Sequence, residues 1–286
     1  MKKIVFILIA IVILSFTFKS KKFKSPEDFV FIPSGKIEMQ GEIYSCNAFW
    51  MAEHEVTNGE YKFFLEDLKK NNRMGDYNAA LPDTNQWTEH GGYMLPMRDH
   101  YFSHPAYTNY PVVNVSKKGA ELYCSYLTEK YRSMYGDVIQ NFRLPARKEW
   151  MYAAASGKNN SIYSWNGPYL RRSNGHCQAN YRKVGDHNIT LTENGPEVVA
   201  DSLHYQEVII NEVYITAPSQ SYWPNDFGLY NMCGNVAEMV ADKDVAVGGD
   251  WHLPGYDIRI LSEQKFDGPN PFTGFRPVLS FVSQDN

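Results

Sequence analysis

The chain has 286 residues, of which 43% are hydrophobic and 21% charged, an ordinary globular composition with room for one or two domains. Six of the 28 basic residues and none of the 32 acidic residues precede position 25, so the remainder holds 22 basic and 32 acidic groups, a net charge of -10. This balance argues against nucleic acid and anionic lipid as partners of residues 25–286.

The N-terminal segment, residues 1–24, has the pattern of a secretory signal or an N-terminal membrane anchor. Lys2 and Lys3 precede an apolar run from Ile4 to Phe18, which is shorter than the roughly 20 residues of a membrane span. No cysteine follows the run directly, so a lipid-modified cysteine is not expected there. We predict an exported protein of a Gram-negative bacterium, in the periplasm or associated with the outer membrane or cell surface, which contacts the membrane only through this segment if it is uncleaved.

Residues 25–286 are predicted to form a single domain that begins with short strands. The apolar bursts 29–32 and 35–39, separated by a Pro-Ser-Gly turn, predict a β-hairpin. Residues 49–58 predict a strand that leads into a helix capped by Thr57 or Asn58. The apolar positions of this helix recur at helical spacing: Tyr61, Phe64, Leu65 and Leu68.

Residues 71–110 are polar and lack periodicity, which predicts a long loop. His100 and His104 are four residues apart in this loop, a spacing that would bring both side chains to one metal ion on a helix. Because Pro105 argues against a regular helix and no carboxylate partner is evident, we favour a packing role for both histidines.

Two helices are predicted in the middle of the chain. Residues 110–116 predict a strand that ends in a cap, and the helix after it has one apolar face: Ala120, Tyr123, Cys124, Leu127 and Tyr131. The second helix is predicted from Lys148 to Ala155, ended by Gly157.

The four cysteines, Cys46, Cys124, Cys177 and Cys233, are not paired at metal-ligand spacing. Export permits disulfides, and four cysteines allow three pairings between which the sequence does not choose. Cys124 lies on an apolar helix face and is predicted to be a buried free thiol.

Residues 224–238, PNDFGLYNMCGNVAE, place oxygen-bearing side chains at short intervals in a loop that Gly228 and Gly234 allow to turn sharply. Carboxylate, amide and carbonyl oxygens that converge on such a turn are the ligands that calcium requires. The alternative is a capped loop, in which the side chains of Asn231 and Asn235 hydrogen-bond to their own turn.

This stretch resembles the core signature of the formylglycine-generating-enzyme (sulfatase-modifying factor) family. Three further segments match the family in the same order: EVTNGEY at 55–61, RLPARKEWMYAA at 143–154, and GFRPV at 274–278. The matches span about residues 29–278. The resemblance implies an α+β fold of the C-type-lectin-like formylglycine-generating-enzyme type, with two main helices, small mostly antiparallel sheets and many loops.

The resemblance also identifies where the family's chemistry would lie. Enzymes of the family hold copper with two cysteines that follow a Gly-Gly-Ser-Trp segment, and the matching stretch here, residues 248–258, reads GGDWHLPGYDI. Leu253 and Ile258 stand at the two cysteine positions, and no cysteine follows Cys233. Because monovalent copper requires soft thiolate ligands, no copper and no catalytic residue is expected.

Calcium is expected as a structural ion on the same basis. The resemblance implies that the side chains of Asn231 and Glu238 and the main-chain carbonyls of Gly234 and Val236 bind it. A second family site begins at positions matching Asn180 and Tyr181. Its later ligands fall in residues 182–213, where the register with the family is lost and Asp201 is a guess.

Two functions of different classes follow. The first is a non-catalytic binding or scaffold protein with an envelope protein or glycan as its ligand, similar to gliding-motility and type IX secretion proteins that carry this domain without the cysteine pair. The alternative is a metal-dependent oxidoreductase with altered chemistry around His252, beside Asp250, Asp257 and Arg259, where the simpler interpretation is a hydrogen-bonded histidine in a groove wall. A hypervariable ligand-binding protein of this fold is a third possibility.

Overall fold

The structure is a computed structural model that describes residues 25–89, 94–136, 139–183, 189–193, 195–198 and 215–280. The predicted signal or anchor segment and Asp201 lie outside these ranges. Within them, no helix is both long enough and apolar enough to cross a membrane.

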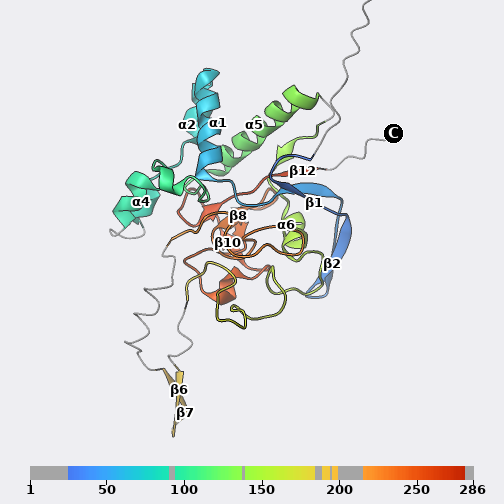
Figure 1. The fold of residues 1–286 in the computed structure, drawn as a ribbon, viewed down its shortest axis with the longest axis vertical. Coiled ribbons are helices and arrows are strands. Elements are labelled where there is room, and N and C mark those ends of the chain that lie inside the picture. The colour runs from blue at the N-terminus through green and yellow to red at the C-terminus, as the bar shows by residue number, and fades with distance from the viewer. Residues whose placement is uncertain are drawn as a thin grey trace, which may run out of the picture.

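Two four-stranded sheets form the centre of the fold (Figure 1). The first is antiparallel throughout and has the strand order β1 (Phe29–Ile32), β4 (Phe49–Ala52), β12 (Val278–Ser280), β5 (Phe142–Arg143). The second has the order β10 (Glu263–Lys265), β9 (Val245–Val247), β8 (Ala237–Met239), β11 (Thr273–Gly274), and only β8 and β11 run parallel. Two hairpins complete the strands: β2 (Gly35–Met39) with β3 (Glu42–Cys46), and β6 (Ile189–Thr192) with β7 (Gly195–Val198). The first sheet joins the N-terminal strands β1 and β4 to the C-terminal strand β12, because β12 pairs with β4.

The predicted hairpin of residues 29–39 is wrong. β1 pairs with β4, and β2 instead forms a hairpin with β3. The reversal occurs at Gln40 and Gly41, whose φ angles of 53° and 85° are the positive values that a tight two-residue hairpin turn requires. The Pro-Ser-Gly segment therefore connects strands of different sheets.

The first helix, α1 (Asn58–Lys70), forms where the sequence predicts it. The hydroxyl of Thr57 accepts a hydrogen bond from the Glu60 amide at 3.2 Å, and the Glu60 carboxylate accepts one from the Thr57 amide at 2.7 Å, a complete capping box. The four predicted apolar positions of the helix are all buried.

The second long helix, α5 (Lys117–Tyr135), also forms as predicted. Ser116 caps its first turn by accepting a hydrogen bond from the Gly119 amide at 3.0 Å. Its five predicted face residues are buried, Cys124 among them, and α5 packs against α1 in one core cluster. Figure 1 shows the two helices on one side of the sheets.

The segment predicted as one long loop, residues 71–110, instead contains α2 (Met74–Ala80), α3 (Gln86–Glu89), α4 (Leu95–His100) and the single 3-10 turn η2 (Pro105–Tyr107). These helices are too short for a periodic pattern, and buried contacts such as the packing of Trp87 on Tyr101, with ring centroids 5.0 Å apart, hold them in place. His100 and His104 are exposed, and His104 caps η2 by accepting a hydrogen bond from the Ala106 amide. Their two rings pack edge to face with centroids 6.3 Å apart, so the predicted packing role is confirmed, as a contact at the surface.

Residues 110–116 do not form the predicted strand. They make a single bridge, from Pro111 to Thr57, and the φ angle of +61° at Asn114 interrupts the extended backbone. The helix predicted from Lys148 to Ala155 forms as α6 (Arg147–Ala154), within one residue of its predicted position, and Gly157 follows it with φ +69°. The α+β class and the C-type-lectin-like architecture of small sheets, helices and long connections are confirmed.

Candidate functional site

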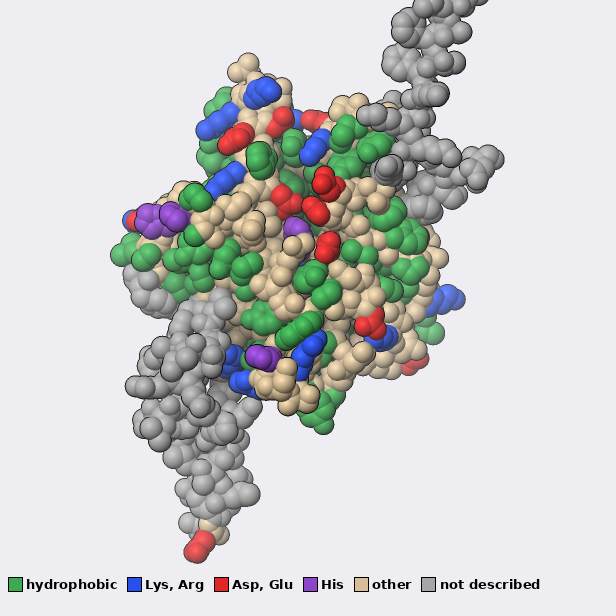
Figure 2. Space-filling model, in the orientation of Figure 1, with side chains coloured by type: hydrophobic (Ala, Val, Ile, Leu, Met, Phe, Trp, Pro, Cys, Tyr) green, Lys and Arg blue, Asp and Glu red, His purple; other side chains and the backbone are tan. Residues whose placement is uncertain are grey.

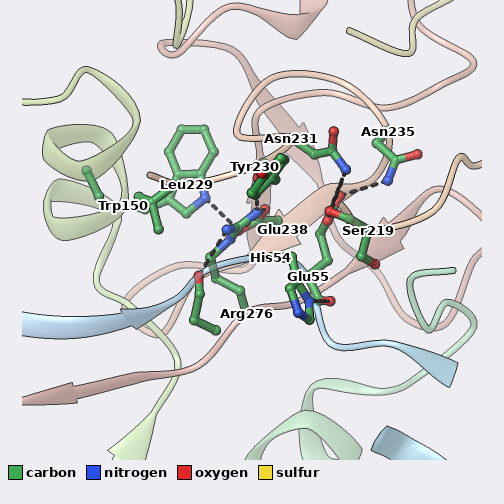
Figure 3. Close-up of polar contacts among 12 residues, drawn as sticks. His54, Glu55, Trp150, Ser219, Leu229, Tyr230, Asn231, Asn235, Glu238 and Arg276 are labelled. Atoms are coloured by element: carbon green, nitrogen blue, oxygen red, sulfur yellow. Dashed lines mark hydrogen bonds and ion pairs between the residues drawn. The ribbon is translucent and has the colours of Figure 1, made fainter. Parts of the chain in front are cut away.

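We call residues 224–238 the signature loop. A buried ion pair lies where this loop enters β8 (Figure 3). Glu238, on β8, is 1% exposed in its side chain, and Arg276, just before β12, is fully buried. The Arg276 Nη2 donates to Glu238 Oε1 at 2.6 Å and its Nε to Oε2 at 2.8 Å. Trp150 of α6 adds a third donor, its indole nitrogen lying 2.8 Å from Oε2. Every charge of the pair is thus matched by a hydrogen bond, the condition under which a buried ion pair persists.

Arg276 also joins three distant segments of the chain. Its Nη1 donates to the carbonyls of Ala52 at 3.1 Å and Glu53 at 3.0 Å, and its Nη2 donates to that of Tyr230 at 2.8 Å. The guanidinium therefore connects β4, the signature loop and β8 at the centre of the domain. This role of Arg276 was not predicted from the sequence, although an arginine in an otherwise apolar segment indicates a buried partner.

A second carboxylate, Glu55, lies beside this pair and is fully buried. It accepts hydrogen bonds from the side-chain amides of Asn235 at 2.8 Å and Asn231 at 3.3 Å (Figure 3). The pKa of Glu55 is raised to about 8, because burial raises it more than the nearby Arg276 lowers it, and Glu238 adds to the rise. Both asparagines also bond to residues 217–219: the Asn231 side-chain amide donates to the Ser219 carbonyl at 2.9 Å, and the Asn235 Oδ1 accepts from the Ala217 amide at 2.7 Å. Glu55 is a partner of the loop that the sequence does not indicate.

The four predicted calcium ligands lie together between Asn231 and β8, where the side chains of Asn231 and Glu238 hydrogen-bond to other protein groups. Three N–H groups donate to Glu238: the Arg276 Nε, shared between Oε1 at 2.9 Å and Oε2 at 2.8 Å, the Arg276 Nη2 to Oε1, and the Trp150 indole to Oε2. The side-chain amide of Asn231 donates to Glu55. Gly234 has a φ of +79°, and Val236, directly before β8, is buried.

Calcium at Asn231 and Glu238 therefore stays a prediction, which melting in calcium and in EGTA tests. A bound ion stabilises the fold by mass action, by about 2.7 kcal/mol at a hundredfold excess over its dissociation constant. A melting temperature that falls on chelation, with no such fall in Asn231→Ala, would confirm the ion. An unchanged melting temperature would leave Glu238 with Arg276 and Trp150 alone.

The two residues predicted for the second calcium site, Asn180 and Tyr181, are buried next to the signature loop. Asn180 donates through its side chain to the Ile215 carbonyl at 2.8 Å, and its own carbonyl accepts from the Asn235 amide at 2.8 Å. A Cβ atom at Gly234 would lie 2.4 Å from that carbonyl, so only glycine fits the approach. The second site, like the first, stays a prediction.

The positions that match the copper-binding cysteines lie in a turn that packs into the core. Ile258 closes the 3-10 turn η3 (Gly255–Ile258), is fully buried, and belongs to the core cluster against which Leu253 packs. Gly249 keeps the backbone close, since its φ is +67° and a Cβ there would lie 2.7 Å from the Ile258 Cα. The backbone of this turn is closely packed at Gly249, and the aliphatic side chains of Leu253 and Ile258 fill the space beside it.

Around His252 the structure describes ring packing and the hydrogen bonds of a turn. The imidazole packs against Phe272, with ring centroids 5.1 Å apart, and the carboxylate of Asp250 accepts a hydrogen bond from the His252 backbone amide at 2.8 Å. Burial raises the pKa of Asp250 to about 7. Arg259 stacks on Tyr256 at 3.4 Å. In the described parts of the chain, no three His, Cys, Asp or Glu side chains form a group that could hold a metal ion.

All four cysteines are free thiols. Cys46, Cys124 and Cys233 are buried, whereas Cys177 is half-buried. Burial raises the pKa of Cys46 to about 11 and that of Cys233 to about 12. The three buried thiols therefore stay protonated at neutral pH, which makes them poor nucleophiles and poor metal ligands.

Comparison with known proteins gives consistent similarities. A family model described as the sulfatase-modifying factor enzyme 1-like domain matches residues 15–281. The chain is similar to a formylglycine-generating enzyme of Bos taurus, at 24% identity over 249 residues, which cover 76% of this chain and 58% of that protein. An inactive C-alpha-formylglycine-generating enzyme 2 of Bos taurus is also 24% identical, over 67% of this chain and 55% of its own length. The chain thus spans little more than half the length of these relatives. Its fold is similar to that of PvdO from Pseudomonas aeruginosa, with a TM-score of 0.56 and 17% identity over 92% of this chain and 98% of that one.

Proposed function

The chain belongs to the sulfatase-modifying factor enzyme 1-like domain family, and from that premise we propose that it is a non-catalytic, ligand-binding member. The observation that supports this most is the replacement of both expected cysteines by the aliphatic residues Leu253 and Ile258. Ile258 is fully buried in a hydrocarbon environment, which offers neither a ligand nor space to an ion.

Thiolates from elsewhere in the chain do not replace the missing pair. Cys233 is the last cysteine in the sequence, is 1% exposed and lies in the core, where burial raises its pKa to about 12. Copper in its monovalent state selects soft thiolate ligands over imidazole or carboxylate. A copper-dependent oxidation of cysteine would therefore have no metal to activate oxygen.

A relative named as inactive provides a precedent for a non-catalytic member beside relatives named as enzymes. A domain without its chemistry still offers loops and surface depressions on a rigid core, and such surfaces serve recognition. We propose an exported protein of the bacterial envelope that binds an envelope protein or a glycan, in a setting such as gliding motility or type IX secretion.

The alternative is an oxidoreductase with altered metal chemistry around His252. Its support is the placement of a histidine and a buried carboxylate, Asp250, in the turn that holds the family's reactive residues. We favour the binding function, because Asp250 is engaged with the backbone of its own turn and the imidazole packs on Phe272.

A copper competition experiment tests the assignment. We expect the wild-type protein to take up no stoichiometric Cu(I) from a colorimetric chelator under reducing, anaerobic conditions. The double variant Leu253→Cys/Ile258→Cys, which restores the thiol pair on the retained turn, should gain copper. Repeating both measurements in a Cys177→Ser background removes the one thiol that is not buried. Stoichiometric uptake by the protein without the restored pair would overturn the proposed function.

A further inference from the structure

A pocket of about 690 Å³ opens between the loop of residues 171–183 and the pair Tyr222 and Trp223. We call it the basic pocket, and its lining includes Arg171, His176, Cys177, Lys183, Tyr222 and Trp223. No Asp or Glu is among the described residues that line it. Its volume lies in the range of pockets that hold small organic ligands.

The charge of this region is opposite to that of the chain as a whole. No acidic residue occurs between Glu149 and Asp186, whereas five basic residues do: Lys158, Arg171, Arg172, Arg182 and Lys183. The chain beyond its first 24 residues carries a net charge of -10. On the face that Figure 2 shows, Asp and Glu side chains gather near the centre, and Lys and Arg side chains occur at the upper end as well as in the lower part. A local excess of one sign raises the concentration of ligands of the other sign.

The basic wall of the pocket is a tight hairpin rather than an open loop. The backbones of Arg171 and Cys177 form an antiparallel β-bridge, and the Arg172 amide donates to the His176 carbonyl at 2.9 Å. Gly175 reverses the chain direction with a φ of +85°. The Arg171 Nη1 donates to the Gly175 carbonyl at 3.0 Å, which fixes the guanidinium over the turn. A charged group held in this way loses little entropy when it binds a ligand.

The aromatic wall is fixed in a similar manner. The guanidinium of Arg172 stacks on the Trp223 ring at 3.5 Å, although 43% of that residue is exposed. Tyr222 has a φ of +62°, a left-handed backbone that costs a bulky residue free energy. Such strain is concentrated at ligand sites, where a side chain must be held in one direction.

We propose that the basic pocket binds an acidic saccharide, whose carboxylate or sulfate groups contact Arg171 and His176 while a sugar ring lies against Tyr222 and Trp223. This assignment rests on the proposed function, since it names the ligand class of a non-catalytic member. An acidic peptide is less suited, because the wall is a closed hairpin and two aromatic residues and offers no open sheet edge for strand addition. Arginine suits carboxylate and sulfate because its planar fork matches their geometry.

Calorimetric titration of the full chain tests the proposal with three probes: tri-galacturonate for carboxylates, a sulfated heparin disaccharide for sulfates, and maltotriose as the neutral control. We expect one of the acidic probes to bind, with an affinity that falls as salt rises, and maltotriose not to bind. Arg171→Ala should weaken binding at least tenfold, and Trp223→Ala should weaken it as well. Arg98→Ala, an arginine on α4 whose partner is Asp99, is the matched control and should leave binding unchanged.

Equal binding of maltotriose, retention of affinity in Arg171→Ala, or tighter binding of a tri-glutamate peptide than of either acidic saccharide would overturn the proposal. Failure of all saccharides, with copper uptake still negative, would remove this ligand class and leave the non-catalytic function standing. Copper uptake by the wild-type protein would instead remove the function, whatever the saccharides do.

Discussion

Replacing Arg276 with methionine is expected to lower the free energy of unfolding by about 3–5 kcal/mol, the cost of leaving a buried charge without its partner. Glu238 would remain buried with only the Trp150 indole as a donor. Three main-chain carbonyls, those of Ala52, Glu53 and Tyr230, would lose a charged donor at the same time. Urea denaturation at constant pH measures the change.

Two further variants separate the ion pair from general damage. Arg276→Met combined with Glu238→Leu removes both charges, and it should recover part of the loss because apolar pairs of similar volume replace buried ion pairs well. Arg98→Met breaks the exposed pair with Asp99 and should change stability little. A loss below about 1 kcal/mol in Arg276→Met would contradict the central role of the pair.

The second large effect is a loss of stability as pH rises from about 4.5 to 8. The pKa of Glu55 is about 8 in the folded protein, whereas a glutamate in the unfolded chain has its ordinary pKa of 4.5. Between these two pH values the folded state therefore holds a proton that the unfolded state has lost. Stability from this group is therefore fully present below pH 4.5 and is lost as pH rises through 8. The slope is about 1.4 kcal/mol per pH unit for one proton. Asp250, raised from 3.8 to about 7, acts in the same direction.

Glu55→Gln isolates the contribution of Glu55. The variant should unfold with a slope about 1.4 kcal/mol per pH unit smaller than that of the wild type between pH 5 and 7.5, measured by urea denaturation at several pH values. Glu129→Gln, at an exposed carboxylate on α5, should keep the wild-type slope. Identical slopes in Glu55→Gln and the wild type would show that Glu55 stays ionised in the fold. A protonated Glu55 leaves Glu238 and Arg276 as one neutral pair at the buried centre.

The elements that the sequence predicts correctly are those whose signals are local. The capping box at Thr57 and Glu60, and the Ser116 cap of α5, determine where both long helices begin. The apolar faces then follow from helical spacing alone. Elements that depend on distant partners were not predictable in this way, because β1 pairs with β4 and the short helices of residues 71–110 rest on buried aromatic contacts.

The candidate site was predictable in part for the same reason. The loop residues Asn231 and Glu238 stand out by their spacing, but their partners, Glu55 and Arg276, are 176 and 38 residues away in the chain. Resemblance marks the segments that contain these partners without stating what they contact. The basic pocket was not predicted, although the sequence indicates it: no acidic residue occurs between Glu149 and Asp186.

The most direct test of the proposed non-catalytic function is an assay for oxidation of a cysteine-containing peptide. The purified chain would be supplied with copper, oxygen and a thiol reductant, and mass spectrometry would follow conversion of the peptide cysteine to formylglycine. Because Leu253 and Ile258 replace the thiolates that copper requires, we expect the peptide to remain unconverted. Oxygen-dependent conversion over many turnovers, abolished by His252→Ala, would contradict the proposed function and establish the oxidoreductase alternative.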